Sequence, residues 1–131
     1  KKLPVDDIIL APVLDAQKGN YYLALYEWQD GELIEYQKVT VVSREELLTR
    51  LSEFAKPVLL LGECAKLAQE SLPPSVKLAH WQVRMPKASS VALLGLDEYN
   101  NGQRKDIFEL NLHYIRRSEA EELWEKRQKK V

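Results

Sequence analysis

The sequence has little of the residues from which disulfide bonds and metal sites are built. Of its 131 residues, one is cysteine (Cys64) and two are histidine (His80 and His113). A single cysteine excludes a disulfide within the chain and fits a reducing compartment, so we expect a cytoplasmic protein. The chain also lacks an excess of either charge, because its 19 Lys and Arg residues nearly balance its 20 Asp and Glu residues and the formal net charge is −1. This excludes a general electrostatic attraction to nucleic acid or to an anionic membrane.

Long apolar runs and methionine are also scarce. No run approaches the roughly 20 apolar residues of a membrane-spanning helix. The only methionine is Met85, and the chain begins with Lys1, so we expect that an amino-terminal portion precedes this sequence. What is present is ordinary for one folded domain: 45% of the residues are hydrophobic and 30% are charged.

Three segments near the start have patterns typical of β-strands: residues 8–14, 21–28 and 32–42. Pro12 in the first segment predicts an edge strand or a bulge, because proline has no N–H for strand pairing. The second segment is apolar on both alternating faces, which predicts a strand covered on both sides. Asp30 and Gly31 predict a two-residue turn between the second and third strands. The three strands should therefore be antiparallel.

Helix signals follow the third strand. Ser43 and Glu46 form a capping box, in which each side chain binds the backbone N–H of the other residue. The apolar residues behind them recur at helical spacing: Leu47, Leu48, Leu51 and Phe54. The next residues predict a strand at 57–61, a helix at 64–72 and a strand at 76–81. They are followed by a predicted helix that has Pro86 in its first turn and ends near residue 101. The last part of the chain predicts an extended segment at 108–115 and a terminal helix that starts from a second capping box at 118–121.

This order, βββαβαβα with a terminal helix, predicts an α/β domain around a mixed five-stranded sheet. It resembles the ribonuclease-H-like lobe of the actin, sugar kinase and Hsp70 ATPase superfamily. Because that lobe usually occurs in pairs, we expect residues 1–131 to be the carboxy-terminal lobe of a two-lobe protein whose amino-terminal lobe is absent from this chain.

The loop of residues 15–20 is the first candidate for chemistry. In ATPases of this superfamily the hairpin after the first strand cradles a phosphate, which requires glycines, a hydroxyl residue and an Asp. Here the loop begins with Asp15, contains Gly19 and ends with Asn20, and it has no serine or threonine. It therefore fits a polar β-turn with Gly19 at positive φ better than a phosphate loop.

Other reactive residues also have ordinary explanations. His80 and His113 lack the spacing of a metal site, and His80 at a strand end beside Trp81 suits packing or a backbone hydrogen bond. Cys64 near a helix start could have a lowered pKa, or it could be a small buried hydrophobic residue. Residues 116–131 carry an excess of basic side chains, which fits a solvated helix better than contact with RNA. We assign no catalytic, cofactor-binding or metal-ligating residue.

Four segments in order resemble the carboxy-terminal half of the bacterial TsaB (YeaZ) family. The hairpin 15–26 (DAQKGNYYLALY) is similar to the family pattern DARRGEVYxAxY, with Gln17 and Asn20 as departures. Residues 60–63 (LLGE) match a strand that ends in Gly-Asp/Glu, and residues 86–93 match a helix of small residues that begins with PxA. Residues 110–121 (LNLHYIRRSEAE) resemble the closing motif LxPxY[LI]R, although Leu112 replaces its proline.

The resemblance implies a function that composition alone does not. TsaB-like proteins are catalytically silent relatives of the enzyme TsaD. With TsaD and the ATPase TsaE they install threonylcarbamoyl on the adenosine beside the anticodon of tRNA. The resemblance therefore implies a scaffold without cofactors whose partners are TsaD-like and TsaE-like proteins. It implies no peptidase activity, although older labels of the family include glycoprotease.

Two alternatives stay open at this point. The chain could be a lobe of an actin-like ATPase or kinase that holds a phosphate between Asp15 and Asn20. It could also be a homodimerising interaction module that uses an exposed apolar face of its sheet or of a helix.

Overall fold

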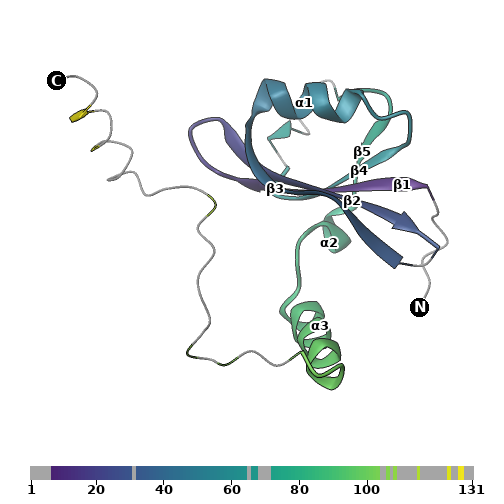
Figure 1. The fold of residues 1–131 in the computed structure, drawn as a ribbon. Coiled ribbons are helices and arrows are strands. Elements are labelled where there is room, and N and C mark those ends of the chain that lie inside the picture. The colour runs from purple at the N-terminus through teal and green to yellow at the C-terminus, as the bar shows by residue number, and fades with distance from the viewer. Residues whose placement is uncertain are drawn as a thin grey trace.

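A five-stranded mixed sheet organises the fold (Figure 1). The computed structural model describes residues 7–30, 32–64, 66–67 and 72–103, together with the single positions 106, 108, 115, 124, 127 and 128. The strands are β1 (Ile8–Asp15), β2 (Asn20–Gln29), β3 (Glu32–Ser43), β4 (Val58–Gly62) and β5 (Val76–Leu78). They lie in the order β3-β2-β1-β4-β5. The first three are antiparallel, whereas β4 is parallel to β1 and to β5, so the predicted mixed sheet is confirmed.

Strand β1 is the centre of the sheet, so the prediction of an edge strand at Pro12 was wrong. Residues 8–10 and residues 13–15 of β1 pair with β2 in the same register. Ala11 and Pro12, which lie between these two segments, have no pairing partner in β2. On its other side Pro12 lies opposite Leu61 of β4. The missing N–H of Pro12 is tolerated because it falls in this interruption of the antiparallel pairing. The register irregularity of the sheet lies one strand away, around Leu25 in the pairing of β2 with β3.

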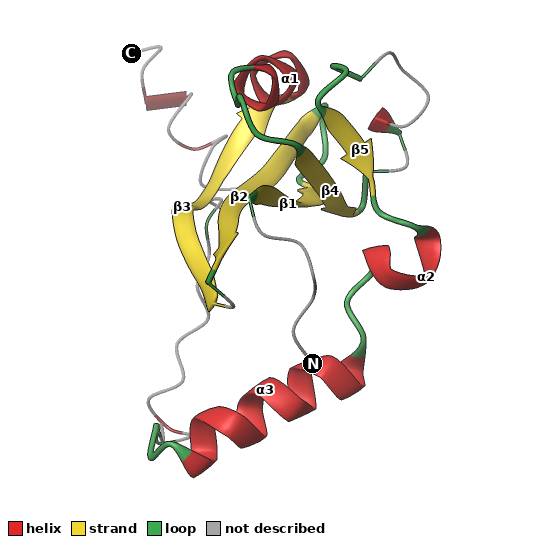
Figure 2. Ribbon diagram, turned by 90° about the vertical axis from the view of Figure 1, so that its right-hand side faces the viewer, coloured by secondary structure: helices red, strands yellow, loops and turns green. Residues whose placement is uncertain are grey.

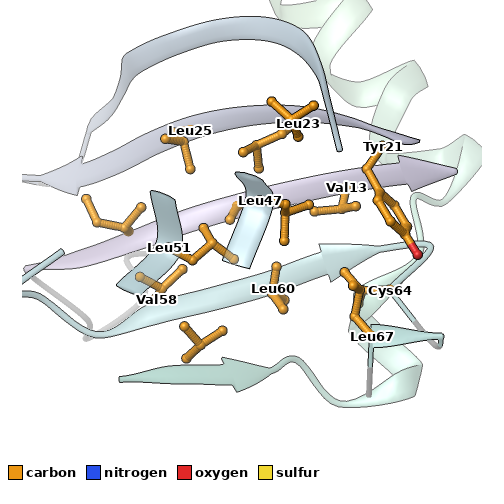
Figure 3. Packing of buried hydrophobic residues seen from close by; sticks show 14 residues of the cluster. Val13, Tyr21, Leu23, Leu25, Leu47, Leu51, Val58, Leu60, Cys64 and Leu67 are labelled. Atoms are coloured by element: carbon orange, nitrogen blue, oxygen red, sulfur yellow. The ribbon is translucent and has the colours of Figure 1, made fainter. Parts of the chain in front are cut away.

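The core lies on one face of the sheet (Figure 3). Alternate residues of the strands point to this face, as the period of two requires, and they are fully buried: Ile9, Ala11, Val13, Leu23, Leu25, Val58 and Leu60. Helix α1 (Arg44–Ser52) covers them with Leu47 and Leu51. The other buried members of the cluster are Tyr21, Val42, Cys64, Leu67 and Val76.

The predicted cap of α1 is confirmed in one half. The Ser43 hydroxyl oxygen accepts a hydrogen bond from the Glu46 N–H at 3.2 Å. The Glu46 carboxylate does not complete the capping box, because it accepts a hydrogen bond from Arg50 one turn further along at 2.6 Å. Phe54 lies beyond the end of the helix, where its ring meets that of Tyr36 edge to face.

The second face of the sheet is covered in part, so the prediction that β2 is covered on both sides is confirmed at Ala24, which is buried, and only partly at the residues around it. Tyr22, Tyr26 and Trp28 alternate with the core residues of β2 and are only half-buried. Leu14 on β1 is 48% exposed. Figures 1 and 2 show the reason: α1 lies close on one side of the sheet, while α2 (Trp81–Arg84) and α3 (Ala88–Asn100) lie on the other side and α3 stands away from it.

Two predicted boundaries on this side were also wrong. The strand expected at 76–81 ends at Leu78, because His80 caps a short helix that begins at Trp81. Its Nδ1 accepts a hydrogen bond from the Gln82 N–H at 3.4 Å. Pro86 lies before α3 and not in its first turn, since the N–H groups of Ser90 and Val91 both donate to the Lys87 carbonyl and so fix Lys87 as the cap.

Several predictions fall on residues that the structure does not describe. The helix expected at 64–72 is described only at Cys64, Lys66, Leu67 and Leu72, where Leu67 lies in a 3₁₀ turn. The extended segment at 108–115 and the terminal helix from residue 118 lie almost wholly outside the described residues. In the part of the chain that is described, no helix has the length and apolar character needed to cross a bilayer.

Gly62 is the position in the sheet where we expect substitution to be most damaging. Its φ is +80°, and a Cβ added there would lie far inside van der Waals contact with the Val13 carbonyl oxygen. We expect Gly62→Ala to lower the free energy of unfolding by about 3 kcal/mol or more, measured by urea denaturation. Gly19→Ala is the matched control, because Gly19 has nearly the same φ of +78° with open space around it. It should lose only about 1 kcal/mol, and equal losses would show that the close contact is unimportant.

Candidate functional site

The carboxyl ends of β1 and β4 form the candidate site. The two strands are parallel neighbours. In the sheet, β2 and β3 lie on one side of β1, and β4 and β5 lie on the other side. In open α/β sheets, ligands bind in the crevice at such a reversal of strand order. Here Asp15 ends β1, and Gly62 and Glu63 follow each other at the end of β4.

Hydrogen bonds hold these strand ends together. The Glu63 N–H donates to the Val13 carbonyl at 2.7 Å. The Glu63 carboxylate in turn accepts a hydrogen bond from the Asp15 N–H at 3.0 Å. Gly62 allows this approach because it has no side chain to meet the Val13 carbonyl. The end of β4 therefore fixes where the loop after β1 begins.

The Asp15 carboxylate is engaged on both oxygens. Oδ1 accepts a hydrogen bond from the Gln17 N–H at 2.7 Å, and Oδ2 pairs with the Lys66 ammonium at 2.7 Å. Lys66, and after it the Gln17 N–H, hold the pKa of Asp15 below its ordinary value. Asp15 in turn raises the pKa of Lys66. Sequence reasoning missed Lys66, which lies 51 positions from Asp15 and has no motif around it.

The loop of residues 15–20 has the geometry of a turn and confirms the predicted positive φ of Gly19, at 78°. Lys18 and Gly19 are the central residues of a turn closed by the Asn20 N–H, which donates to the Gln17 carbonyl at 3.0 Å. The Ala16 N–H donates to the Asn20 carbonyl at 2.9 Å. A phosphate loop needs several backbone N–H groups that point outward together, whereas those of Ala16, Gln17 and Asn20 already have acceptors within the loop.

A groove of about 500 Å³ lies beside these strand ends. One wall is made by β1 and β4, and the other by α2 and the segment that leads into α3. The lining residues are Pro12, Val13, Leu14, Leu61, Gly62, Val83, Arg84, Met85, Pro86, Lys87 and Ser90. Among the described residues that line it, Arg84 and Lys87 are cations, none is a carboxylate, and most of the others are apolar. No sequence motif indicates this groove, because its walls come from three separate parts of the chain.

The other candidates from the sequence have structural roles where they are described. His80 caps α2, as the predicted backbone hydrogen bond required, and its ring lies 5.7 Å from that of Trp81. His113 lies outside the described residues. Among the residues that are described, no three His, Cys, Asp or Glu side chains gather as a metal site would require.

Cys64 is a buried core residue. Its side chain is 0% exposed, and its Sγ lies 3.6 Å from the Gly62 carbonyl oxygen, to which it donates. Burial raises the pKa of the Cys64 thiol, with an opposing effect from Arg84. The structure thus contradicts the hypothesis of a thiol activated at a helix start and confirms that of a small buried hydrophobic residue.

Comparisons with known proteins agree with this architecture. No family profile matches the chain. The chain is 28% identical to the tRNA threonylcarbamoyladenosine biosynthesis protein TsaB of Bacillus subtilis (strain 168), in a match that covers 94% of this chain and 54% of that protein. Its fold is similar to the crystal structure of an uncharacterized Pseudomonas aeruginosa protein with similarity to peptidase YeaZ. The TM-score is 0.62 at 18% identity, over 84% of this chain and 50% of the other.

The fold is therefore that of a YeaZ-like α/β protein, and it is consistent with a ribonuclease-H-like sheet. Together with the sequence match along nearly the whole chain, it makes this chain similar to TsaB (YeaZ) proteins in both sequence and fold. The chain spans about half the length of the relatives that it matches.

The Asp15–Lys66 pair predicts a specific titration. Because the pKa of Asp15 is lowered in the folded state, the pair contributes stability above the ordinary carboxyl pKa and loses it as the pH falls through the lowered value. We expect the carboxyl ¹³C signal of Asp15 to titrate at a higher pH in Lys66→Met, and near the native pH in Lys66→Arg. An unchanged Asp15 titration in Lys66→Met would contradict the pairing.

The burial of Cys64 predicts slow thiol chemistry. We expect the native protein to react with a disulfide reagent such as DTNB at least about a hundredfold more slowly than the urea-unfolded chain, because only opened molecules expose the thiol. A Cys64→Ser variant should show no reaction in either state. A native rate close to the unfolded rate would contradict the burial.

Proposed function

We propose that this chain takes part in the biosynthesis of threonylcarbamoyladenosine in tRNA as a non-catalytic scaffold. The observation that carries the proposal is the similarity to the Bacillus subtilis TsaB protein along 94% of the chain. In this proposal the partners are a TsaD-like enzyme, which performs the transfer, and a TsaE-like protein. The proposed location is the cytoplasm, where the tRNA is modified.

The proposal includes a place for the chain in a larger molecule. Residues 1–131 form one lobe, the carboxy-terminal one, of a two-lobe protein. Its support is the half-length coverage of both relatives together with the partly open second face of the sheet. A lobe that packs against another needs an apolar surface of this kind.

The scaffold role is supported by the state of the residues that could have performed chemistry. Asp15 is held by Lys66 and by the Gln17 N–H, so it is not directed at a ligand. Cys64 is enclosed in the core. These contacts stabilise the fold, and they favour the scaffold over the alternative of an ATPase or kinase that binds phosphate at residues 15–20.

Deletion and complementation test the proposal. Deleting the gene in the source organism should strongly lower threonylcarbamoyladenosine in digested tRNA, measured by mass spectrometry of nucleosides. The intact gene should restore it, and so should an Asp15→Asn variant, because a scaffold needs no catalytic carboxylate.

The outcomes separate the two functions. A core variant such as Leu60→Asp should fail to restore the nucleoside, because it buries a charge in the core and unfolds the chain. If the nucleoside is unaffected by the deletion, the role in tRNA modification is wrong. If Asp15→Asn is folded yet inactive, and the intact protein binds ATP with Mg²⁺ in calorimetry, the enzymatic alternative replaces the scaffold.

A further inference from the structure

The proposed scaffold role does not use the groove beside the carboxyl ends of β1 and β4. Its volume of about 500 Å³ falls within the usual range of small-molecule sites, roughly 300–1,000 Å³. Figures 1 and 2 show α2 between the sheet and α3, and α2 lies close to β4. Together with the segment that leads into α3, it forms the wall opposite the strands. The groove therefore has the size of a site for a small organic molecule.

Apolar side chains line the groove on both sides. Leu14 of β1 is 48% exposed, and on the opposite wall Val83 and Met85 are 66% and 42% exposed. Exposed apolar side chains that line a groove are unfavourable in water, and an apolar body that displaces this water stabilises them. The groove therefore suits a ligand with a hydrocarbon part.

Two cations give the groove its charge. Arg84 is the last residue of α2, and Lys87 is the cap residue of α3. None of the other described lining residues is a carboxylate that could neutralise them. Within the described part of the chain, neither Arg84 nor Lys87 forms an ion pair. Two such cations beside an apolar wall attract an anion.

The Arg84 side chain also has an unsatisfied hydrogen-bond donor. Its Nε is buried and has no acceptor among the described residues. Nearly all buried polar groups in proteins are paired, and an unpaired one is unfavourable. Burial raises the pKa of Cys64 and the charge of Arg84 opposes this rise, so the guanidinium lies near the end of β4. An anion beside the guanidinium would offset the unfavourable burial of its Nε.

The groups around the two cations favour a carboxylate over a phosphate. The planar guanidinium matches the two oxygens of a carboxylate, and Ser90 adds a hydroxyl to the lining. A phosphate site usually takes several backbone N–H groups that point outward together. In the loop after β1, the N–H groups of Ala16, Gln17 and Asn20 already have acceptors within the loop.

We propose that this groove binds a small organic carboxylate with an apolar body. The carboxylate pairs with the Arg84 guanidinium and the Lys87 ammonium, and the Ser90 hydroxyl donates to it. The apolar body lies between Leu14 and Met85. This binding site goes beyond the scaffold role and does not depend on it.

The single methionine of the chain provides a direct measurement of binding. Met85 lines the groove, so the 131-residue chain labelled with [methyl-¹³C]methionine carries an NMR probe inside the proposed site, identified by its loss in Met85→Leu. We expect hexanoate to shift this signal to saturation with a dissociation constant on the order of millimolar, as is usual for so small a ligand. 1-Hexanol, which lacks the charge, should bind about tenfold more weakly. Acetate lacks the apolar body and hexylamine has the opposite charge, so neither should shift the signal at the same concentrations.

Variants of the two cations test the charged part of the site. Arg84→Met and Lys87→Met each remove one charge and keep a long apolar side chain, so each should weaken hexanoate binding about tenfold and leave 1-hexanol binding unchanged. Arg84→Lys should bind more tightly than Arg84→Met, because it keeps the charge without the planar fork. Lys38→Met is the matched control, since Lys38 is exposed on the edge strand β3 at the far side of the sheet. The ¹H–¹⁵N spectrum of each variant checks that it is folded.

Four results would overturn the proposal. The first is a Met85 signal that does not respond to hexanoate or responds without saturation. The second is 1-hexanol that binds as tightly as hexanoate, and the third is native affinity in both Arg84→Met and Lys87→Met. The fourth is hexyl phosphate that binds about tenfold more tightly than hexanoate, which would identify a phosphate site. These measurements concern ligand binding alone, so a negative result leaves the role in tRNA modification to be decided by its own nucleoside analysis.

Discussion

The close contact between Gly62 and the Val13 carbonyl is the constraint on which the rest of this structure depends. It brings the carboxyl end of β4 against the carboxyl-terminal part of β1, the central strand of the sheet. Only a residue without a side chain fits there, and the Glu63 N–H then reaches the same carbonyl. The next residue, Cys64, is thereby directed into the core, and Lys66 comes within reach of Asp15. One backbone contact thus determines the core boundary, the loop after β1 and one wall of the groove.

The two faces of the sheet have different roles. One face is a closed core, in which alternate residues of the strands pack against Leu47 and Leu51 of α1. The other face carries apolar side chains that are only half-covered, and α3 extends from the same side without burying any of its residues. The relatives that this chain matches are about twice as long, and a half-covered apolar surface suits contact with further protein, which is what the proposed scaffold requires.

The residues that first suggested chemistry are used for structure. Asp15 orders the turn after β1, His80 caps α2 and Cys64 fills the core. Each of these roles follows from a contact that the side chain makes with nearby backbone or with an apolar environment. A protein in which such side chains are engaged in this way is well suited to present a fixed surface to a partner, and this is the basis of the proposed supporting role in tRNA modification.

The sequence by itself determined what depends on near neighbours in the chain. Short runs of apolar, aromatic and β-branched residues located the strands, Ser43 located the start of α1, and Gly19 located the turn after β1, because each signal acts over a few residues. Only the tertiary structure decided the place of Pro12 in the central strand, the pairing of Asp15 with Lys66 and the groove beside Gly62. These features join segments about 50 residues apart, and no local pattern records which segments will meet. The sheet order brings them together, and the sheet order is set by the packing of the whole core.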